Sequence, residues 1–484
     1  MTPLSFYQKM LVVLILSVII FFGLFHITES PPFGFDEGWA THIASNISRV
    51  GIDGTQFSPG NIGHVPLISV GYPLIYALAF WFKIFGVGIL QARIMMVVYM
   101  LGFAIISFLF LRRLYGNNIA LASLAILSTF PPFYTFGKSV IGEVPVLFFL
   151  MLFLLSFNLA TNNPKRRKFW LILSGVVAGL CIITKTMALV FIPALFVGAF
   201  MAWKRKSVSW KDIYIVTIST IIPIIVWIIT NFQPGESLAY VADYYSNPSA
   251  LTDKTATFWL NFRMFWSGIG PLYMLSLIFV WIIGIIIRLK VRTRIFTEEF
   301  IALTFSTLLI LSFLFRYWDA RYLFPVQVLG ILFAPYSLYS IWLAMPIKLD
   351  IIKKTRIFYF GVIIPCILGL YQLSFHSYIA DSYKSTRTED LSRYFSSIPD
   401  STSIFFYNTP NMLPFFHGNN YYQRIAMFEK WVVGSEFAPI VNAGRVNMLV
   451  LNPPMTKADE KLSLDNYVEV AKFGKTSILK RKTE

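Results

Sequence analysis

The sequence predicts an all-α polytopic membrane protein with about 11 transmembrane helices and a small C-terminal α/β domain. Of its 484 residues, 56% are hydrophobic, and the mean hydropathy is +0.65. Only 13% are charged, about half the usual share of a soluble domain. Long apolar runs recur along the chain. These observations exclude a soluble globular enzyme, a disordered protein and a disulfide-stapled secreted domain.

Eleven runs come close to the ~20 apolar residues that a membrane-crossing helix needs. They are Met10–Ile27, Leu90–Leu111, Ile119–Tyr134, Val144–Ala160, Trp170–Thr184, Met187–Trp203, Ile213–Thr230, Trp266–Ile287, Phe300–Phe315, Tyr322–Leu343 and Ile357–Phe375. A further run, Tyr72–Phe85, is only 14 residues long. Its length favours an interfacial or re-entrant helix over a crossing.

The placement of basic residues sets the orientation. The net charge is +17, with 41 Lys and Arg against 24 Asp and Glu. If the N-terminus is cytoplasmic and eleven spans follow, the inside loops hold 19 basic residues and four acidic ones. A crossing by Tyr72–Phe85 would reverse this bias, so the positive-inside rule supports eleven spans. The excess of basic residues is therefore explained by the cytoplasmic loops of a membrane protein. We expect the protein in the plasma (inner) membrane, with no nucleic-acid partner.

Three regions are then expected on the extracytoplasmic side: a loop at about 28–89, a loop at about 231–265 and a tail. We expect residues 1–375 to form the transmembrane domain and residues 376–484 to form a small soluble domain. Within the tail, Ser403–Tyr407, Val446–Leu451 and Tyr467–Ala471 predict short strands, and Thr388–Ser397 predicts a helix.

Two adjacent carboxylates, Asp36 and Glu37, stand in the first outer loop just before a helical pattern that stops at Gly51. One interpretation is structural: Asp36 caps the helix and Glu37 lies in its first turn. The other is that Asp36 is an acid/base group at the mouth of the bundle. The two are compatible, since a capping carboxylate keeps free lone pairs.

Other charged residues stand at the outer ends of predicted spans. Glu143 opens the fourth span, either as a helix-start acid or as a second carboxylate facing Asp36. Lys185 ends the fifth span, where a lysine either snorkels to the headgroups or serves a function. Arg321 opens the tenth span, and Arg263 ends the second long outer loop. For both, interfacial anchoring is the structural alternative, and Asp319 is the expected partner of Arg321.

Carboxylates and cations at one face of a bundle suit group transfer from a lipid phosphate. Arginine binds phosphate oxygens bidentately and lysine acts as a point charge, while a carboxylate takes a proton from an incoming hydroxyl or amine. The sequence contains no phosphate-binding Gly-x-x-x-x-Gly-Lys-Ser/Thr loop, no dinucleotide-binding Gly-x-Gly-x-x-Gly motif and no zinc-type Cys/His spacing. The energy for transfer must therefore come from an already activated donor.

At these residues the chain resembles the GT-C superfamily of lipid-phosphate-dependent membrane glycosyltransferases, in the branch of protein O-mannosyltransferases and the lipid A aminoarabinose transferase. The resemblance runs through roughly residues 10–345 and continues more weakly in the tail. Five motifs carry it in order: Asp36-Glu37; His64-Val65-Pro66-Leu67; Lys138 with Glu143-Val144-Pro145; Gly179 to Lys185; and Arg321-Tyr322-Leu323-Phe324-Pro325. Lys138 and Glu143 stand where Arg and Asp are usual, and His64 stands where a charged Lys is an alternative.

The resemblance implies an inverting glycosyltransferase, moving a hexosyl or pentosyl group from a polyprenyl-phosphate donor to a glycolipid, polysaccharide or protein. Asp36 would activate the acceptor, with Glu143 and Glu37 as further catalytic residues. The implied substrate-binding residues are His64, Lys138, Lys185, Arg263, Arg321 and Tyr322. The resemblance implies no metal and no cofactor besides the lipid-phosphate sugar.

Two other functions remain open: a transporter or flippase of lipid-linked glycans, and an inactive scaffold. A transporter predicts ionisable residues near the bilayer midplane and paired broken helices. The placement of Asp36, Glu143 and Lys185 separates these hypotheses: convergence supports the enzyme, and dispersal supports the others.

Overall fold

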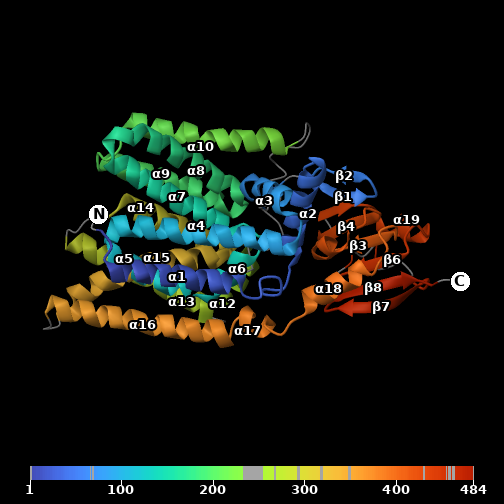
Figure 1. The fold of residues 1–484 in the computed structure, drawn as a ribbon. Coiled ribbons are helices and arrows are strands. Elements are labelled where there is room, and N and C mark those ends of the chain that lie inside the picture. Colours follow the sequence, from blue (N-terminus) through green and yellow to red (C-terminus); the bar gives the residue numbers. More distant parts are fainter. Residues whose placement is uncertain are drawn as a thin grey trace.

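The computed structural model describes residues 3–65, 67, 70–232, 254–265, 269–291, 295–316, 320–346, 350–428, 431–453, 455, 459 and 464–482. A bundle of long apolar helices carries a smaller α/β domain at one end (Figure 1). The N-terminus lies at the opposite end of the bundle from this domain. The predicted fold class is confirmed.

Long helices account for most of the predicted spans. The helices of the bundle are α1 (Phe6–Leu24), α4 (Ile89–Tyr115), α5 (Asn117–Ser128), α6 (Pro131–Lys138), α7 (Glu143–Asn162), α8 (Arg167–Thr184), α9 (Phe191–Lys204), α10 (Trp210–Asn231), α12 (Lys254–Met264), α13 (Ile269–Lys290), α14 (Thr297–Arg316), α15 (Phe324–Ala344) and α16 (Ile351–Phe375). Short 3-10 turns precede α8, α9 and α15: η1 (Pro164–Arg166), η2 (Thr186–Val190) and η3 (Ala320–Leu323). Within the described residues, nine helices are long and apolar enough to cross a membrane, or ten if the bent pair α5–α6 is one span. The predicted run Trp266–Ile287 begins outside the described residues and continues as α13.

The third predicted span is not one straight helix. It breaks between α5 and α6 with a bend of 69°. Pro131 and Pro132 open α6 at its first positions. Proline lacks the N–H that an unbroken helix needs and clashes with the preceding turn, so the break falls there. The segment expected to be a loop before Glu143 is therefore partly helical, and Lys138 lies in the last turn of α6.

The first outer loop contains α2 (Phe35–Val50), the hairpin of β1 (Thr55–Ser58) and β2 (Asn61–Gly63), and α3 (Tyr72–Phe85). The helix α3 has the predicted bounds and lies at the same end of the bundle as the C-terminal domain (Figure 1). The prediction that Asp36 caps α2 is wrong, because the cap residue is Gly34. Both carboxylates therefore lie in the first turn, and the helix ends at Gly51 with φ +73°, as predicted.

The tail folds around a six-stranded sheet with strand order β5-β4-β3-β6-β8-β7. Its elements are α17 (Tyr378–Ser382), α18 (Arg387–Ser396), β3 (Ile404–Tyr407), the 3-10 turn η4 (Pro410–Phe415), β4 (Tyr421–Phe428), β5 (Trp431–Gly434), α19 (Phe437–Asn442), β6 (Met448–Leu451), β7 (Tyr467–Phe473) and β8 (Thr476–Arg481). The central strand β3 pairs in parallel with β4 and β6, and all four of its side chains are buried. The three predicted strands and the predicted helix are present. The strands β4, β5 and β8 were not predicted.

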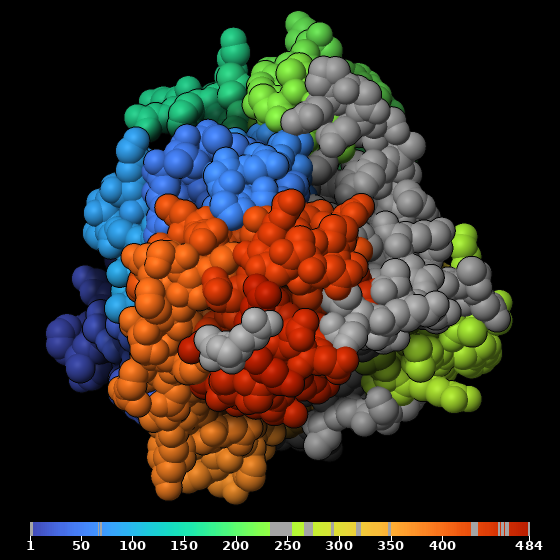
Figure 2. Space-filling view, turned by 90° about the vertical axis from the view of Figure 1, so that its right-hand side faces the viewer, coloured from blue at the N-terminus to red at the C-terminus, as the bar shows by residue number. Residues whose placement is uncertain are grey.

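The C-terminal domain packs directly on the first outer loop. In Figure 2, residues of this loop (blue) lie against the orange and red surface of the domain. The η4 turn approaches the first turn of α2 so closely that a Cβ on Gly38 would lie 2.4 Å from the backbone of Asn411. The Thr55 hydroxyl donates to Gln423 across the same junction, at 3.1 Å. Contacts therefore tie the start of α2 to the C-terminal domain.

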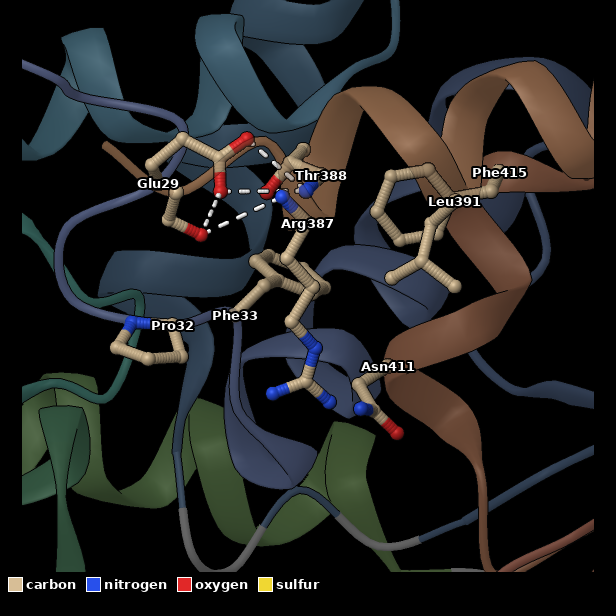
Figure 3. Close-up of a pocket in the computed structure, with 9 residues that line it drawn as sticks. Glu29, Pro32, Phe33, Arg387, Thr388, Leu391, Asn411 and Phe415 are labelled. Atoms are coloured by element: carbon tan, nitrogen blue, oxygen red, sulfur yellow. Dashed lines mark hydrogen bonds between the residues drawn. The ribbon is translucent and has the colours of Figure 1, made fainter. Parts of the chain in front are cut away.

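A second contact joins the end of the first span to α18. Figure 3 shows Glu29 pointing at the start of this helix, with Phe33 and Leu391 nearby. The Thr388 backbone N–H donates to both oxygens of Glu29, at 2.9 and 3.2 Å, and the Ser385 hydroxyl donates to one of them. A carboxylate at a helix N-terminus satisfies N–H groups that have no partner within the helix. Glu29 thus provides an N-terminal cap from outside the helix.

Acid is expected to weaken the junction through His42, a buried residue of α2. Its Nε2 accepts from the Gln56 N–H at 3.3 Å and lies 3.4 Å from the Tyr421 hydroxyl. Burial, with a smaller effect of Arg49, lowers the pKa of His42 from 6.5 to about 4. The unfolded chain therefore binds more protons below pH 6.5, so stability falls as pH drops from 6.5 to 4, by up to about 3 kcal/mol. Thermal unfolding measured across this range tests the expectation. A His42→Gln variant should lose this part of the pH dependence, and an unchanged slope in that variant would contradict it.

Candidate active site

Four distant segments meet at the end of the bundle that carries the C-terminal domain: the first turn of α2, the first turn of α7, the turn after α8, and η3. They form two ion pairs. Nη2 of Arg321 lies 2.6 Å from Oδ2 of Asp36, and Nζ of Lys185 lies 2.5 Å from Oε1 of Glu143. The Tyr322 ring is close to both cations, with its centroid 5.6 Å from Lys185 Nζ and 5.3 Å from Arg321 Cζ. The predicted convergence of Asp36, Glu143 and Lys185 is therefore present.

The two ion pairs differ in their access to solvent. In the Asp36–Arg321 pair, 36% of the Asp36 side chain and 24% of the Arg321 side chain are exposed. In the Glu143–Lys185 pair, the corresponding values are 0% and 7%. The Lys185 amine also donates to the Ile141 carbonyl at 2.6 Å. Because the amine of Lys185 is buried and donates two hydrogen bonds, this side chain does not snorkel to the headgroups.

The position of Lys185 depends on a close backbone contact. The helix α8 ends at Thr184, and Lys185 follows in an extended conformation. The Gly71 N–H, just before α3, donates to the Thr184 carbonyl at 2.8 Å. A Cβ on Gly71 would lie 1.7 Å from the Ile183 carbonyl oxygen, so no other residue fits without a shift of the backbone. The start of α3 therefore supports the turn that carries Lys185.

Glu37 faces away from the Asp36 pair and contacts Arg93 of α4. Both residues are fully buried, and Nε and Nη2 of Arg93 donate to the two Glu37 oxygens at 2.8 and 2.9 Å. Arg93 also donates to the Ile27 carbonyl at 2.7 Å, and Glu37 accepts from the Val140 N–H at 3.4 Å. The pair thus links the start of α2 to the segment that leads to Glu143.

Sequence reasoning missed Arg93. It lies near the start of the predicted span Leu90–Leu111. This run is long and apolar enough to be recognised as a span even with one charged residue in it. A signal was nevertheless present, because an ionisable residue inside an apolar span is a candidate functional or structural partner by default. The partner itself could not be inferred from the sequence.

The remaining predicted residues lie in different surroundings. Lys138 is buried and donates to the Phe25 carbonyl at 3.1 Å; it has no ion-pair partner within the described part of the chain. The ring nitrogens of His64 face the carbonyls of Asp53 and Asn231, at 3.3 and 3.1 Å. Arg263 is exposed in the last turn of α12. None of these three takes part in the two ion pairs, and Asp319 lies outside the described residues.

Known proteins share the fold. A family model described as dolichyl-phosphate-mannose-protein mannosyltransferase matches residues 72–229. The crystal structure of ArnT from Cupriavidus metallidurans bound to undecaprenyl phosphate has a TM-score of 0.60 and 14% sequence identity, and the match covers 97% of each chain. An Archaeoglobus fulgidus oligosaccharyltransferase tethered to an acceptor peptide has a TM-score of 0.56 and 13% identity, covering 93% of this chain and 69% of that one. No curated protein matches the sequence.

Proposed function

We propose that the chain, which has the GT-C fold in its ArnT-like form, is an inverting glycosyltransferase. It moves a sugar from a polyprenyl-phosphate donor to an acceptor on the extracytoplasmic side of the plasma membrane. The observation that supports this most is the ion pair of Asp36 with Arg321, a carboxylate and a partly exposed guanidinium from distant segments. Together they supply a proton acceptor and a phosphate ligand within one site.

In the proposed reaction, the acceptor's hydroxyl or amine attacks the anomeric carbon from the face opposite the phosphate. Asp36 takes the proton from the attacking group. The bond between the anomeric carbon and the phosphate oxygen breaks, and its electron pair leaves with the lipid phosphate. Arg321 stabilises the negative charge that develops on the departing phosphate, which is where a preorganised cation is most effective.

We assign the buried pair a supporting role. Lys185 interacts electrostatically with Arg321 and Asp36. Its amine is nevertheless held by hydrogen bonds to Glu143 and the Ile141 carbonyl. It therefore adds positive potential without leaving its position. Glu143 keeps one buried oxygen that has no hydrogen-bond partner in the described structure. That oxygen is a candidate for contact with the acceptor or the sugar.

The acceptor class stays broad in this proposal: a glycolipid, a polysaccharide or a protein. The structures with the same fold include one bound to undecaprenyl phosphate and one tethered to an acceptor peptide. The lipid-phosphate sugar is proposed as the only co-substrate, with no metal or nucleotide. The gathering of Asp36, Glu143 and Lys185 at one end of the bundle supports an enzyme over a flippase, which would need ionisable groups near the midplane.

The direct test combines cells and a reconstituted reaction. Mass spectrometry of envelope glycans, glycolipids and glycoproteins, with and without the gene, should reveal one class that loses a sugar when the gene is deleted and regains it on complementation. The purified chain should then transfer that sugar from a polyprenyl-phosphate donor in the presence of EDTA. Unchanged envelope profiles together with no transfer in vitro would contradict the proposal.

A further inference from the structure

The two ion pairs of the site differ in how easily they can be separated. The Asp36–Arg321 pair is partly exposed, and such pairs are weak because water screens them. The Glu143–Lys185 pair is buried, and separating it would leave two uncompensated charges in the interior. An anion that enters from solvent or lipid can therefore form an ion pair with Arg321 more easily than with Lys185. Lys185 remains with Glu143.

The charges of this site also balance. Asp36 and Glu143 neutralise Arg321 and Lys185, so an incoming phosphate finds no spare cation among these four groups. A phosphate that binds here must compete with a carboxylate for its cation. Geometry selects the carboxylate, because only Asp36 holds its partner at an accessible position.

We propose that Asp36 and the phosphate of the lipid donor are alternative partners of Arg321, so that donor binding displaces Asp36 and releases it for catalysis. This inference rests on the proposed function and adds a mode of regulation to its site. In the structure described here, Asp36 is held by Arg321 at 2.6 Å and its charge is compensated. Once phosphate occupies Arg321, Asp36 has lost its cation and lies near a second anion. Both changes make its carboxylate a stronger proton acceptor.

The exchange implies an order of events. Without donor, the base is bound to a guanidinium and activates acceptors poorly. With donor in place, the base is free beside the sugar that is to be transferred. In the structure the Tyr322 ring lies near both cations, and these contacts favour a position of Arg321 beside Lys185. Donor binding should therefore precede productive acceptor binding.

Binding of undecaprenyl phosphate to the full-length protein in detergent micelles tests the exchange. An Asp36→Asn variant lacks the competing charge and should bind this lipid more tightly, by about two- to tenfold, since the pair it removes is a partly exposed one. Arg321→Ala should weaken binding at least about tenfold. In the double variant the gain should vanish, so that it binds like Arg321→Ala alone. Glu389→Gln, which removes a carboxylate from an exposed pair with Arg393 on α18, is the matched control and should bind like the natural protein.

The outcomes separate the two levels of the proposal. If the natural protein binds the lipid but Asp36→Asn binds it equally or less tightly, the exchange is wrong while the glycosyltransferase assignment stands. If Asp36→Asn tightens binding just as much in the Arg321→Ala background, the effect is one of overall charge, and the exchange is again wrong. A natural protein that binds no undecaprenyl phosphate overturns both. Thermal unfolding of each variant confirms that the compared proteins are folded.

Discussion

An Asp36→Asn variant is expected to lose sugar transfer by about 10²–10⁴-fold, the contribution typical of a positioned acid or base. Asparagine has the same size and can still accept a hydrogen bond from Arg321, but it cannot take the acceptor's proton. The Asp36–Arg321 pair is partly exposed, so its loss should change the free energy of unfolding by no more than about 1 kcal/mol. Initial transfer rates and thermal unfolding of the purified variant measure the two effects separately.

This result has two internal checks. Glu389→Gln removes a more exposed carboxylate that forms an ion pair with Arg393 within α18. This variant should transfer sugar at the natural rate. The Asp36→Asn variant should also bind donor at least as well as the natural protein, which places the defect in the chemical step. Transfer by Asp36→Asn within about threefold of the natural rate would remove Asp36 from the role of base.

The sequence singled out charged residues that converge in the structure, but it did not indicate their partners. Glu143, Lys185 and Arg321 could be singled out because each is a charge at the end of an apolar run, and Asp36 because it is one of two adjacent carboxylates in the first outer loop. Their pairing could not, since it depends on which helix ends become neighbours after folding. For Arg321 the nearby Asp319 was the natural candidate, and it lies outside the described residues. Among the described residues, Arg321 pairs with Asp36 from the first outer loop, which the sequence did not indicate.

The two adjacent acids of the first outer loop illustrate the same limit. In the sequence Asp36 and Glu37 look equivalent. On a helix, consecutive side chains point about 100° apart, so the two face different neighbours. Asp36 meets Arg321 near the surface, and Glu37 meets Arg93 in the interior. The orientation of the first turn of α2, which sequence alone does not give, decides which carboxylate is accessible.

At the level of the fold, most of the long apolar helices and three strands of the tail were predictable, and the strands β4, β5 and β8 were not. The helix α3, which is apolar apart from Lys83, and the apolar strand β3 lie close to their predicted positions. The strands β4 and β8 carry charged or amide side chains among apolar ones, and their pairing partners in the sheet stabilise them more than local preference does. The break between α5 and α6 could have been foreseen from Pro131-Pro132.

Replacing Arg93 by Met is expected to destabilise the protein by about 3–5 kcal/mol, because it leaves the Glu37 carboxylate buried without its cation. Replacing both partners, as Arg93→Met with Glu37→Gln, should restore at least half of that loss. The glutamine carries no charge and can still accept from the Val140 N–H. Thermal or chemical unfolding of the single and double variants measures the difference. A double variant no more stable than Arg93→Met would show that the pair is not the source of the effect.

The same double variant decides what Glu37 contributes to the reaction. Both oxygens of Glu37 are bonded to Arg93, and this pair joins the start of α2 to the residues before Glu143. If the pair only holds Asp36 and Glu143 in position, the folded double variant should transfer sugar within about tenfold of the natural rate. This range is expected when reacting groups shift slightly but none is lost. If transfer instead falls as far as in Asp36→Asn while the protein is folded, the Glu37 carboxylate itself takes part in the chemistry. The structure favours the first result, because a fully buried and bidentately paired carboxylate has no oxygen left to offer a substrate.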